Sequence, residues 1–306
     1  MRELLYEITH TTTYDYVGSV SVSHHLLRLT PRHGGAQRVL AHELRIDPDP
    51  AVLHAHRDYF GNTTHFLSVE RPHGRLSVTA HSRVALRPPF IPEPSETPAW
   101  EAVRARCRDD HSSGALEAHE FIYPSPCVPT GPEFAEFAGP SFPRGRPLLE
   151  AVLDLTRRIH AGFQFDPEAT TVSTPVRQVL ERRRGVCQDF AHLQIACLRS
   201  LSLPARYVSG YLETDPPPGQ AKLRGTDASH AWVAFYCPGV GWLDTDPTNN
   251  CLPSLRHVTI GWGRDYGDVG PVRGVLMGGQ GQALSVAVDV VAQGPVSPER
   301  AHAPRA

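Results

Sequence analysis

The chain has 306 residues, of which 40% are hydrophobic and 20% are charged, and its formal net charge is -2. This composition predicts an ordinary globular protein of roughly two domains, long enough to bury a core without disulfides. A near-neutral protein lacks the electrostatic attraction that nucleic acids and anionic membranes require, so we expect neither as a partner.

The cysteines and the amino terminus favour a cytoplasmic protein. MRELLYEITH carries charges and lacks the apolar segment of a signal peptide, and no run of about 20 apolar residues predicts a transmembrane helix. The six cysteines form no CxxC pair, which argues against a zinc ribbon or a disulfide framework. The seventeen histidines include no HExxH or similarly spaced set, so we expect no metal and no cofactor.

The first 90 residues alternate with a period of two. In LYEITHTTTYDY, one parity carries Tyr6, Ile8 and His10, and the other is mostly polar; RLSVTAHSRVAL repeats the pattern. Such alternation is typical of antiparallel strands with one wet face. Turn residues such as DPDP and FGN separate the runs. We predict an antiparallel β-sandwich-like domain over residues 1–90.

The remainder of the chain predicts an α+β core. Residues 91–146 form a proline-rich connector with short helices, and LLEAVLDLTRRIHAGF and STPVRQVLERRRG predict two longer helices, the second ending at Gly185. LPARYVSGYLET, HAWVAFY, GWLDTDP and ALSVAVDVV predict strands. We assign the core and a C-terminal strand to residues 147–292, and a disordered tail to residues 293–306.

GVCQDFAHL places Cys187 at the predicted start of a helix, because Phe190, Leu193 and Cys197 recur at helical spacing. Unpaired N–H groups and the helix dipole favour an anion there, and thiols at helix starts ionise more readily than a free thiol of pKa about 8.5. Asp189 is expected to face away from the thiol and hold a structural hydrogen bond. This segment alone leaves Cys187 open between a nucleophile and a packing residue.

His230 is the candidate base for this thiol. Pairing Tyr236 with Trp242 across the turn CPGVG makes Asp246 the diagonal neighbour of His230, about 7–8 Å away between Cα atoms. Asp244 would lie roughly 13 Å away along the strand. The geometry favours Asp246 as the group that orients the ring, although a register slip of two residues would change the choice.

Three further features have structural explanations. His192 lies about 500° round the helix from the cysteine, so we expect a buried, hydrogen-bonded residue rather than a rival base. The tryptophans of the strand region are expected in the core of the sheet, although one could line a cleft. The polar run RDYGD at 264–268 is expected to brace a loop through charge pairs.

GVCQDFAHL, ARYVSGYL and SHAWVAFYCPGVGWLDTDPTNN together resemble the catalytic core of the transglutaminase-like superfamily of cysteine enzymes. Cys187, His230 and Asp246 match its cysteine at a helix start, its histidine before Ala-Trp and its aspartate before Pro-Thr. YEITHTTTYDY, LRLTPR and DYFGN resemble the β-rich region that precedes this core in bacterial members, which are commonly described as candidate cysteine proteases. The resemblance covers residues 3–292.

The resemblance implies a papain/transglutaminase-like core and acyl transfer on amide bonds through a thioester. Cys187 would attack a peptide or protein amide, His230 would protonate the departing amine, and Asp246 would hold the ring. The Cys187 N–H would be one oxyanion donor. Gln164 is a weak candidate for the second donor, and Gln188 could instead face solvent.

Two questions stay open at this point. Water would resolve the thioester in a protease or amidase, which we favour, whereas an amine would resolve it in a transglutaminase. The alternative from another class is a non-catalytic peptide-binding or scaffold protein, since some members of the superfamily have lost the triad. The oligomeric state is also open.

Overall fold

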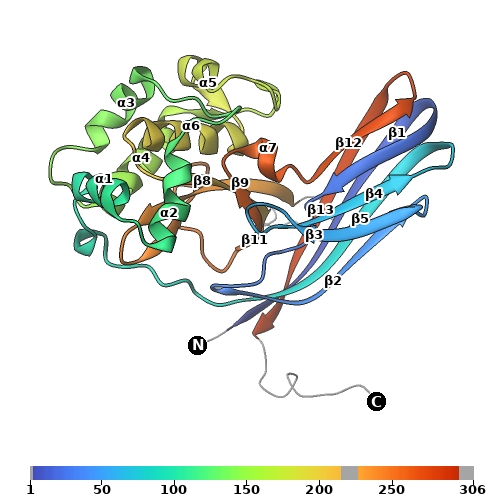
Figure 1. The fold of residues 1–306 in the computed structure, drawn as a ribbon, viewed down its shortest axis with the longest axis horizontal. Coiled ribbons are helices and arrows are strands. Elements are labelled where there is room, and N and C mark those ends of the chain that lie inside the picture. The colour runs from blue at the N-terminus through green and yellow to red at the C-terminus, as the bar shows by residue number, and fades with distance from the viewer. Residues whose placement is uncertain (1–2, 215–226, 296–306) are drawn as a thin grey trace, which may run out of the picture.

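The computed structural model describes residues 3–214 and 227–295, and these residues have a mixed α+β fold, as predicted. A long curved sheet lies beside a helical body, and a smaller sheet lies between them (Figure 1). The curved sheet is antiparallel and has seven strands: β1 (Leu4–Leu27), β2 (Gln37–Asp47), β3 (Val52–Arg57), β4 (Thr63–Val69), β5 (His73–Leu86), β12 (Val272–Gly278) and β13 (Gln282–Pro295).

Strand β1 is the centre of the curved sheet. It pairs along one side with β5 and then β4, and along the other side with β13 and then β12. The sheet curls, and Tyr16, Val20 and Leu27 from the second half of β1 share one buried cluster with side chains of β4 and β5. This curling explains how alternating strands in a single sheet form the sandwich-like domain that the sequence predicts.

The C-terminal strand belongs to this sheet and not to the sheet of the core. The run ALSVAVDVV lies in β13, which pairs with β1. Val288 and Val290 of this strand pack with Tyr6 and Ile8 of β1 in a shared cluster, which favours the pairing. The strand continues to Pro295, so the start of the expected tail is ordered β-structure. Residues 296–306 lie outside the described residues.

The second sheet has the order β10-β9-β8-β11 and carries the helices on one face. The predicted register is confirmed, since Trp242 pairs with Tyr236. Its strands are β8 (Ala205–Leu212), β9 (Ala228–Cys237), β10 (Gly241–Thr245) and β11 (His257–Gly263). The helices are α1 (Trp100–Asp109), α2 (Ser113–His119), α3 (Pro132–Ala138), α4 (Leu148–Gly162), α5 (Val176–Arg182), α6 (Cys187–Ser200) and α7 (Tyr266–Val269).

The segment predicted as a connector is packed into the helical body. Val103, Phe134 and Phe142 belong to the same buried cluster as α4 and α6. Helix α5 ends earlier than predicted, at Arg182, because Arg183 takes the left-handed conformation, with φ of 56°. Gly185 lies in the short strand β7 (Arg184–Gly185), which pairs with β6 (Gln164–Phe165).

The two sheets are joined by a common apolar cluster. Tyr6, Ile8 and Val288 from the curved sheet contact Tyr211 and Val258 from the smaller one. Burial of apolar surface at this junction favours a fixed arrangement of the two parts. Among the described residues, every helix is too short or too polar to cross a bilayer.

Candidate active site

Cys187 is the first residue of α6, at a helix start that the local sequence determines. The Asp189 carboxylate accepts a hydrogen bond from the Val186 backbone N–H (2.8 Å) and another from the Thr170 hydroxyl (2.6 Å). The expectation of a structural role for Asp189 is therefore confirmed. A Cβ atom at Gly185 would lie 2.6 Å from that carboxylate, so a glycine is needed immediately before the helix.

The start of α6 favours an anion near the sulfur. The N–H group of Cys187 is among the first donors of the helix, which have no acceptor within it, and they lie at the positive end of the helix dipole. Cys197 is fully buried on the core-facing stripe of the helix, as predicted. Cys187 itself is half-buried and lines a cavity.

His230 and Asp246 are joined across the β9–β10 hairpin. Nε2 of His230 lies 2.7 Å from Oδ2 of Asp246, in agreement with the predicted diagonal placement. Asp244 instead accepts a hydrogen bond from the indole N–H of Trp232, at 3.2 Å. The histidine is therefore hydrogen-bonded to Asp246 and not to Asp244.

The Asp246 carboxylate is fully buried and is held by several donors. Oδ1 accepts the backbone N–H groups of Thr248 and Asn249, at 2.9 and 3.1 Å, and Oδ2 accepts the Asn249 side-chain amide at 2.7 Å. Burial raises the pKa of Asp246, but hydrogen bonds from His230 and His257 and the charge of His230 outweigh it and hold the pKa below its usual value. The carboxylate therefore stays ionised.

His230 is poised as an imidazolium between an acid and a thiol. Burial lowers its pKa, but hydrogen bonds to the side chains of Asp246 and Cys187, and the charges of both, raise the pKa to about 10. Because Nε2 is bonded to Asp246, Nδ1 is the ring nitrogen left for the sulfur. This arrangement can activate a thiol and later deliver a proton.

His257 on β11 and Asn249 are supporting residues that sequence reasoning missed. Nε2 of His257 lies 3.2 Å from Oδ2 of Asp246. The turn DTDPTNN offered a signal for Asn249, because an aspartate that starts a turn commonly accepts nearby N–H groups. No local pattern marks His257. It belongs to β11, which β8 separates from β9 in the sheet, so its contact with the carboxylate depends on the order of the strands.

His230, Asp246 and His257 also offer three metal-ligand atoms within 4.8 Å of one another. Their spacing along the chain gave no sign of this grouping. The N–O distances of 2.7 and 3.2 Å fit hydrogen bonds, which occupy the same lone pairs that an ion would need. The absence of a metal cofactor stays a prediction.

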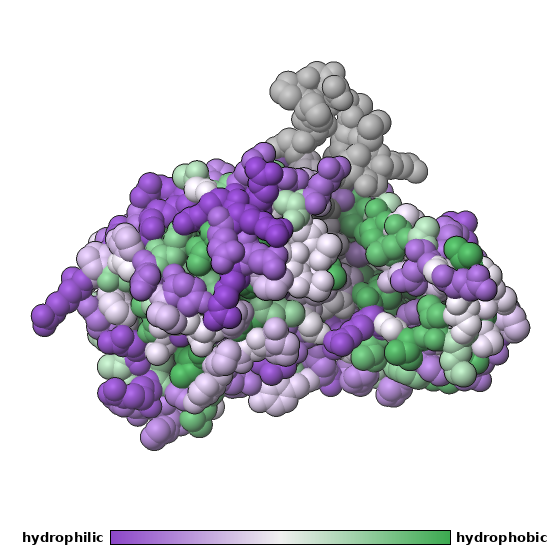
Figure 2. Space-filling model, turned by 90° about the horizontal axis from the view of Figure 1, so that it is seen from above, coloured by the Kyte–Doolittle hydropathy of each residue, from purple (hydrophilic) through white to green (hydrophobic). Residues whose placement is uncertain are grey.

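Cys187 and His230 line a cavity of about 430 Å³ at the junction with the curved sheet. Strand β1 supplies His10, Thr12 and Tyr14 to its opposite wall, and β13 supplies the apolar side chains Leu284, Val286 and Val288. Figure 2 shows apolar side chains on the sheet end of the molecule. Leu284 and Val286 are both exposed. The amino-terminal domain is therefore part of the candidate active site.

Tyr207 on β8 is another lining residue that the sequence did not single out. Burial, and then the charge of a Cys187 thiolate, raise its pKa well above the usual value, so the hydroxyl stays protonated. Gln188 also lines the cavity and donates to the Val172 carbonyl at 3.3 Å, whereas Gln164 is exposed on β6 outside the lining. His192 is buried and accepts the Tyr266 N–H at 3.1 Å, as expected of a structural residue.

Comparison with known proteins agrees with this architecture. Residues 6–85 match the bacterial transglutaminase-like N-terminal region, and residues 141–247 match the transglutaminase-like superfamily. An uncharacterized protein of Mycobacterium tuberculosis is 42% identical over 295 residues, covering 94% of this chain and 92% of that protein. The chain belongs to the transglutaminase-like superfamily.

Two further relatives bear on this transglutaminase-like protein. A solved structure from Cytophaga hutchinsonii, described as a candidate cysteine protease, shares the fold with a TM-score of 0.77 at 21% identity, covering 96% of this chain and 92% of that one. A protein-glutamine gamma-glutamyltransferase of Pseudomonas aeruginosa is 31% identical over 129 residues, covering 36% of this chain and 19% of that protein. Membership of the superfamily supports a general cysteine-dependent acyl transfer.

Proposed function

We propose that this transglutaminase-like protein hydrolyses amide bonds through a thioester on Cys187, with His230 and Asp246 completing the triad. The observation that carries the proposal is the meeting of the three groups. The 2.7 Å hydrogen bond to Asp246 orients the imidazole, and His230 and Cys187 line the same cavity, where the thiol contributes to the raised pKa of the ring. The substrate class is a peptide bond or a glutamine-type side-chain amide.

The proposed reaction has two steps. The Cys187 sulfur attacks the carbonyl carbon, and after the tetrahedral intermediate collapses a C–S bond has replaced the C–N bond. The imidazolium of His230 gives its proton to the departing amine or ammonia. Water then attacks the thioester while His230 accepts a proton from it and passes that proton to the sulfur, which releases a carboxylic acid. Asp246 stays ionised and holds the ring and its tautomer.

The oxyanion needs two donors, and we assign them to the Cys187 N–H and the Tyr207 hydroxyl. Tyr207 lines the cavity beside the sulfur, and within the described part of the chain its hydroxyl forms no hydrogen bond. The raised pKa keeps the proton that a donor requires. A donor without a competing acceptor is available to the charge that develops in the transition state.

Replacing Tyr207 by phenylalanine is therefore expected to lower kcat by about 10²-fold, with little change in KM, because the lost hydrogen bond forms mainly in the transition state. Steady-state kinetics on a peptide amide would measure this split. Tyr236→Phe, on β9 outside the cavity lining, is the matched control. A rise in KM at constant kcat would instead make Tyr207 a residue of ground-state binding.

Alkylation tests the nucleophile directly. Burial raises the pKa of the other five cysteines, so their thiols stay protonated at neutral pH. Iodoacetamide at neutral pH is expected to modify Cys187 at least about tenfold faster than any of them, as followed by peptide mass mapping. His230→Ala removes the imidazolium and is expected to remove this selectivity.

Uniform, slow alkylation of all six cysteines would contradict the proposal and favour the non-catalytic peptide-binding alternative. The second test is chemical: an acyl adduct trapped on Cys187 after exposure to a peptide library. Its mass would identify the acyl group, and its absence from Cys187→Ala protein is the control. An adduct on another cysteine would overturn the assignment.

Amine transfer is the second candidate function, and the Pseudomonas relative named as a protein-glutamine gamma-glutamyltransferase supports it. The same triad serves both reactions, since only the acceptor differs. An amine-incorporation assay beside a peptide-release assay separates them. Hydrolysis predicts that release exceeds incorporation even when a primary amine is present in excess.

A further inference from the structure

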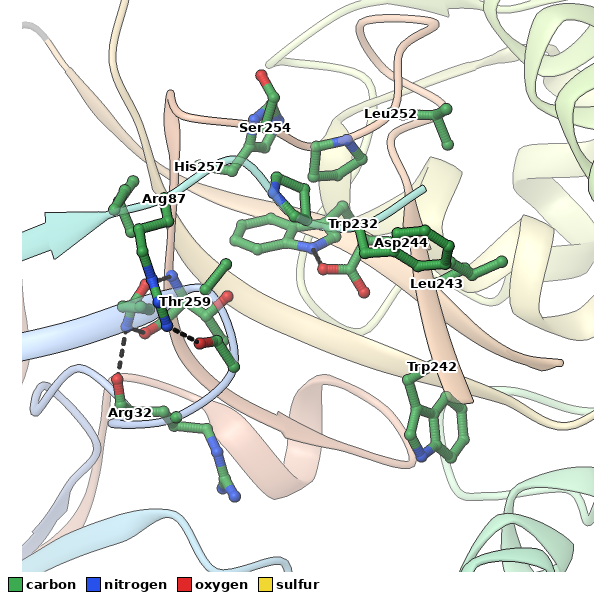
Figure 3. A pocket seen from close by; sticks show the side chains of 18 of the residues that line it. Arg32, Arg87, Trp232, Trp242, Leu243, Asp244, Leu252, Ser254, His257 and Thr259 are labelled. Atoms are coloured by element: carbon green, nitrogen blue, oxygen red, sulfur yellow. Dashed lines mark hydrogen bonds between the residues drawn. The ribbon is translucent and has the colours of Figure 1, made fainter. Parts of the chain in front are cut away.

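A second cavity, of about 330 Å³, lies on the reverse face of the four-stranded sheet. Its lining shares no residue with the cavity that contains Cys187. Alternation along the strands explains the separation: Tyr207 and Ala231 pack on the α6 side, whereas their neighbours Arg206 and Trp232 face the other way. Figure 3 shows Trp232, Asp244 and His257 close together in this cavity.

Arg206 is a buried cation in the lining of this cavity, and among the described residues it has neither a hydrogen-bond nor an ion-pair partner. Arg206 is only 8% exposed, and its guanidinium carbon lies 4.0 Å from the ring centroid of Trp242 and 3.8 Å from that of Trp262. Two indole rings therefore lie against the guanidinium carbon. Within the described residues Arg206 forms no hydrogen bond and no ion pair, and its Nε is completely enclosed.

An arginine in this state is unusual, because buried charges are normally paired. Burial lowers the pKa of Arg206 to about 9, with the charge of Asp244 opposing the shift and that of Arg32 adding to it. Arg32 lies on Trp262 as well, 3.4 Å from its centroid, and with Arg87 three arginines border the space. Asp244 is the acidic side chain of the lining, and its carboxylate is held by the Trp232 N–H.

The rest of the lining is largely apolar. Phe90, Ile91 and Leu252 face the same space as the tryptophans. A cavity of this volume and character is suited to a molecule of about one ring, with a polar group at one end. Asp244 would repel a second negative charge, which favours a ligand with a single carboxylate.

We propose that this cavity binds a small organic monocarboxylate with an apolar body, and that the carboxylate pairs with the edge of Arg206. Planar guanidinium and carboxylate groups match each other in charge and geometry. His257 also lines the cavity, and among the described residues its buried Nδ1 has no hydrogen-bond partner, while its Nε2 contacts Asp246. The site therefore adjoins the carboxylate that orients His230, but binding itself does not depend on the proposed reaction.

Isothermal titration of Cys187→Ala protein with benzoate tests the inference without any catalytic activity. One benzoate is expected to bind per chain, with neutral benzamide at least about tenfold weaker, because it lacks the charge that pairs with Arg206. Arg206→Met should weaken benzoate by at least about tenfold, and Asp244→Asn should tighten it, since a competing charge is removed. Arg104→Met is the control: Arg104 is exposed and lies 4.9 Å from the Trp100 ring, outside the cavity.

Three results would overturn the inference. The first is no benzoate binding at about 10 mM, a concentration well above a Kd of about 1 mM. The others are equal affinity for benzoate and benzamide, and unchanged benzoate affinity in Arg206→Met. Circular dichroism establishes whether each variant folds. If Arg206→Met does not fold, Arg206→Lys and Asp244→Asn decide the matter. Lysine keeps the charge but loses the planar donor edge and should weaken benzoate, whereas the asparagine variant should act in the opposite direction.

Discussion

Cys187→Ser protein is expected to lose at least about 10⁴-fold in kcat/KM for amide hydrolysis, because a serine hydroxyl beside an imidazolium is a far weaker nucleophile than a thiolate. The substitution is nearly isosteric at a half-buried position, so the thermal midpoint should change little. An assay of release from a peptide library measures kcat/KM, and a thermal melt followed by circular dichroism measures the midpoint and checks folding.

Cys127→Ser is the matched control, because Cys127 is also half-buried and does not line the cavity that contains Cys187. Its activity should remain within about threefold of the unmodified protein, the scatter expected of substitutions outside the site. Retention of most activity in the Cys187 variant, or an equal loss in both, would refute the assignment of the nucleophile.

Asp246→Asn is expected to lower kcat by about 10³- to 10⁴-fold while the protein still folds. The asparagine side chain is uncharged, and its NH2 group donates where the carboxylate accepted from Nε2 of His230, so the ring is held in the wrong tautomer and the imidazolium loses its counter-charge. The pH–rate profile should shift as well, because the pKa of His230, raised to about 10 largely by hydrogen bonds to Asp246 and Cys187, falls once the acid is removed.

The same substitution has a pH-dependent cost in stability. The folded pKa of His230 lies above its unfolded value of about 6.5, so its contribution is complete below about pH 6.5 and is lost as the pH rises through about 10. The folded pKa of Asp246 is depressed, so its contribution is present above about pH 3.9 and is lost as the pH falls. The gap in thermal midpoint between the two proteins should be widest between about pH 4 and 6.5.

Asp58→Asn is a suitable control for both measurements. The Asp58 carboxylate also accepts two backbone N–H groups, from Phe60 and Asn62, but it lies in the amino-terminal domain and pairs with Arg28. It should alter stability without changing the pH–rate profile. A wild-type profile in Asp246→Asn protein would contradict the proposed role of Asp246, whatever the stability.

Local patterns were sufficient for the helix start and the hairpin. The spacing of Phe190, Leu193 and Cys197 defines a buried stripe and hence where α6 begins. The turn between β9 and β10 fixes the register, and a register fixes which side chains are diagonal neighbours. Because a hairpin is a local structure, the sequence alone favoured Asp246 over Asp244 as the partner of His230.

The supporting histidine, His257, and the wall of the cavity could not be found from local patterns. His257 reaches Asp246 from β11, and β8 lies between β11 and β9, so the contact depends on the order of strands in the sheet. The wall that β1 contributes to the cavity is separated from Cys187 by more than half the chain, and the pairing of β13 with β1 is equally remote. Periodicity describes which face a residue takes, but not which other element meets that face.

The sequence by itself predicted the α+β class and the strand register of the hairpin from spacing within one or two elements, and its resemblance to the superfamily implied the thiol, imidazole and carboxylate of the candidate triad. Only the tertiary structure decided that the curved sheet closes one side of the cavity, that a second histidine holds the acid, and that Arg206 lies against two indoles. These features arise from packing between elements far apart in the chain, where burial and shape, not local conformational preference, select the neighbours.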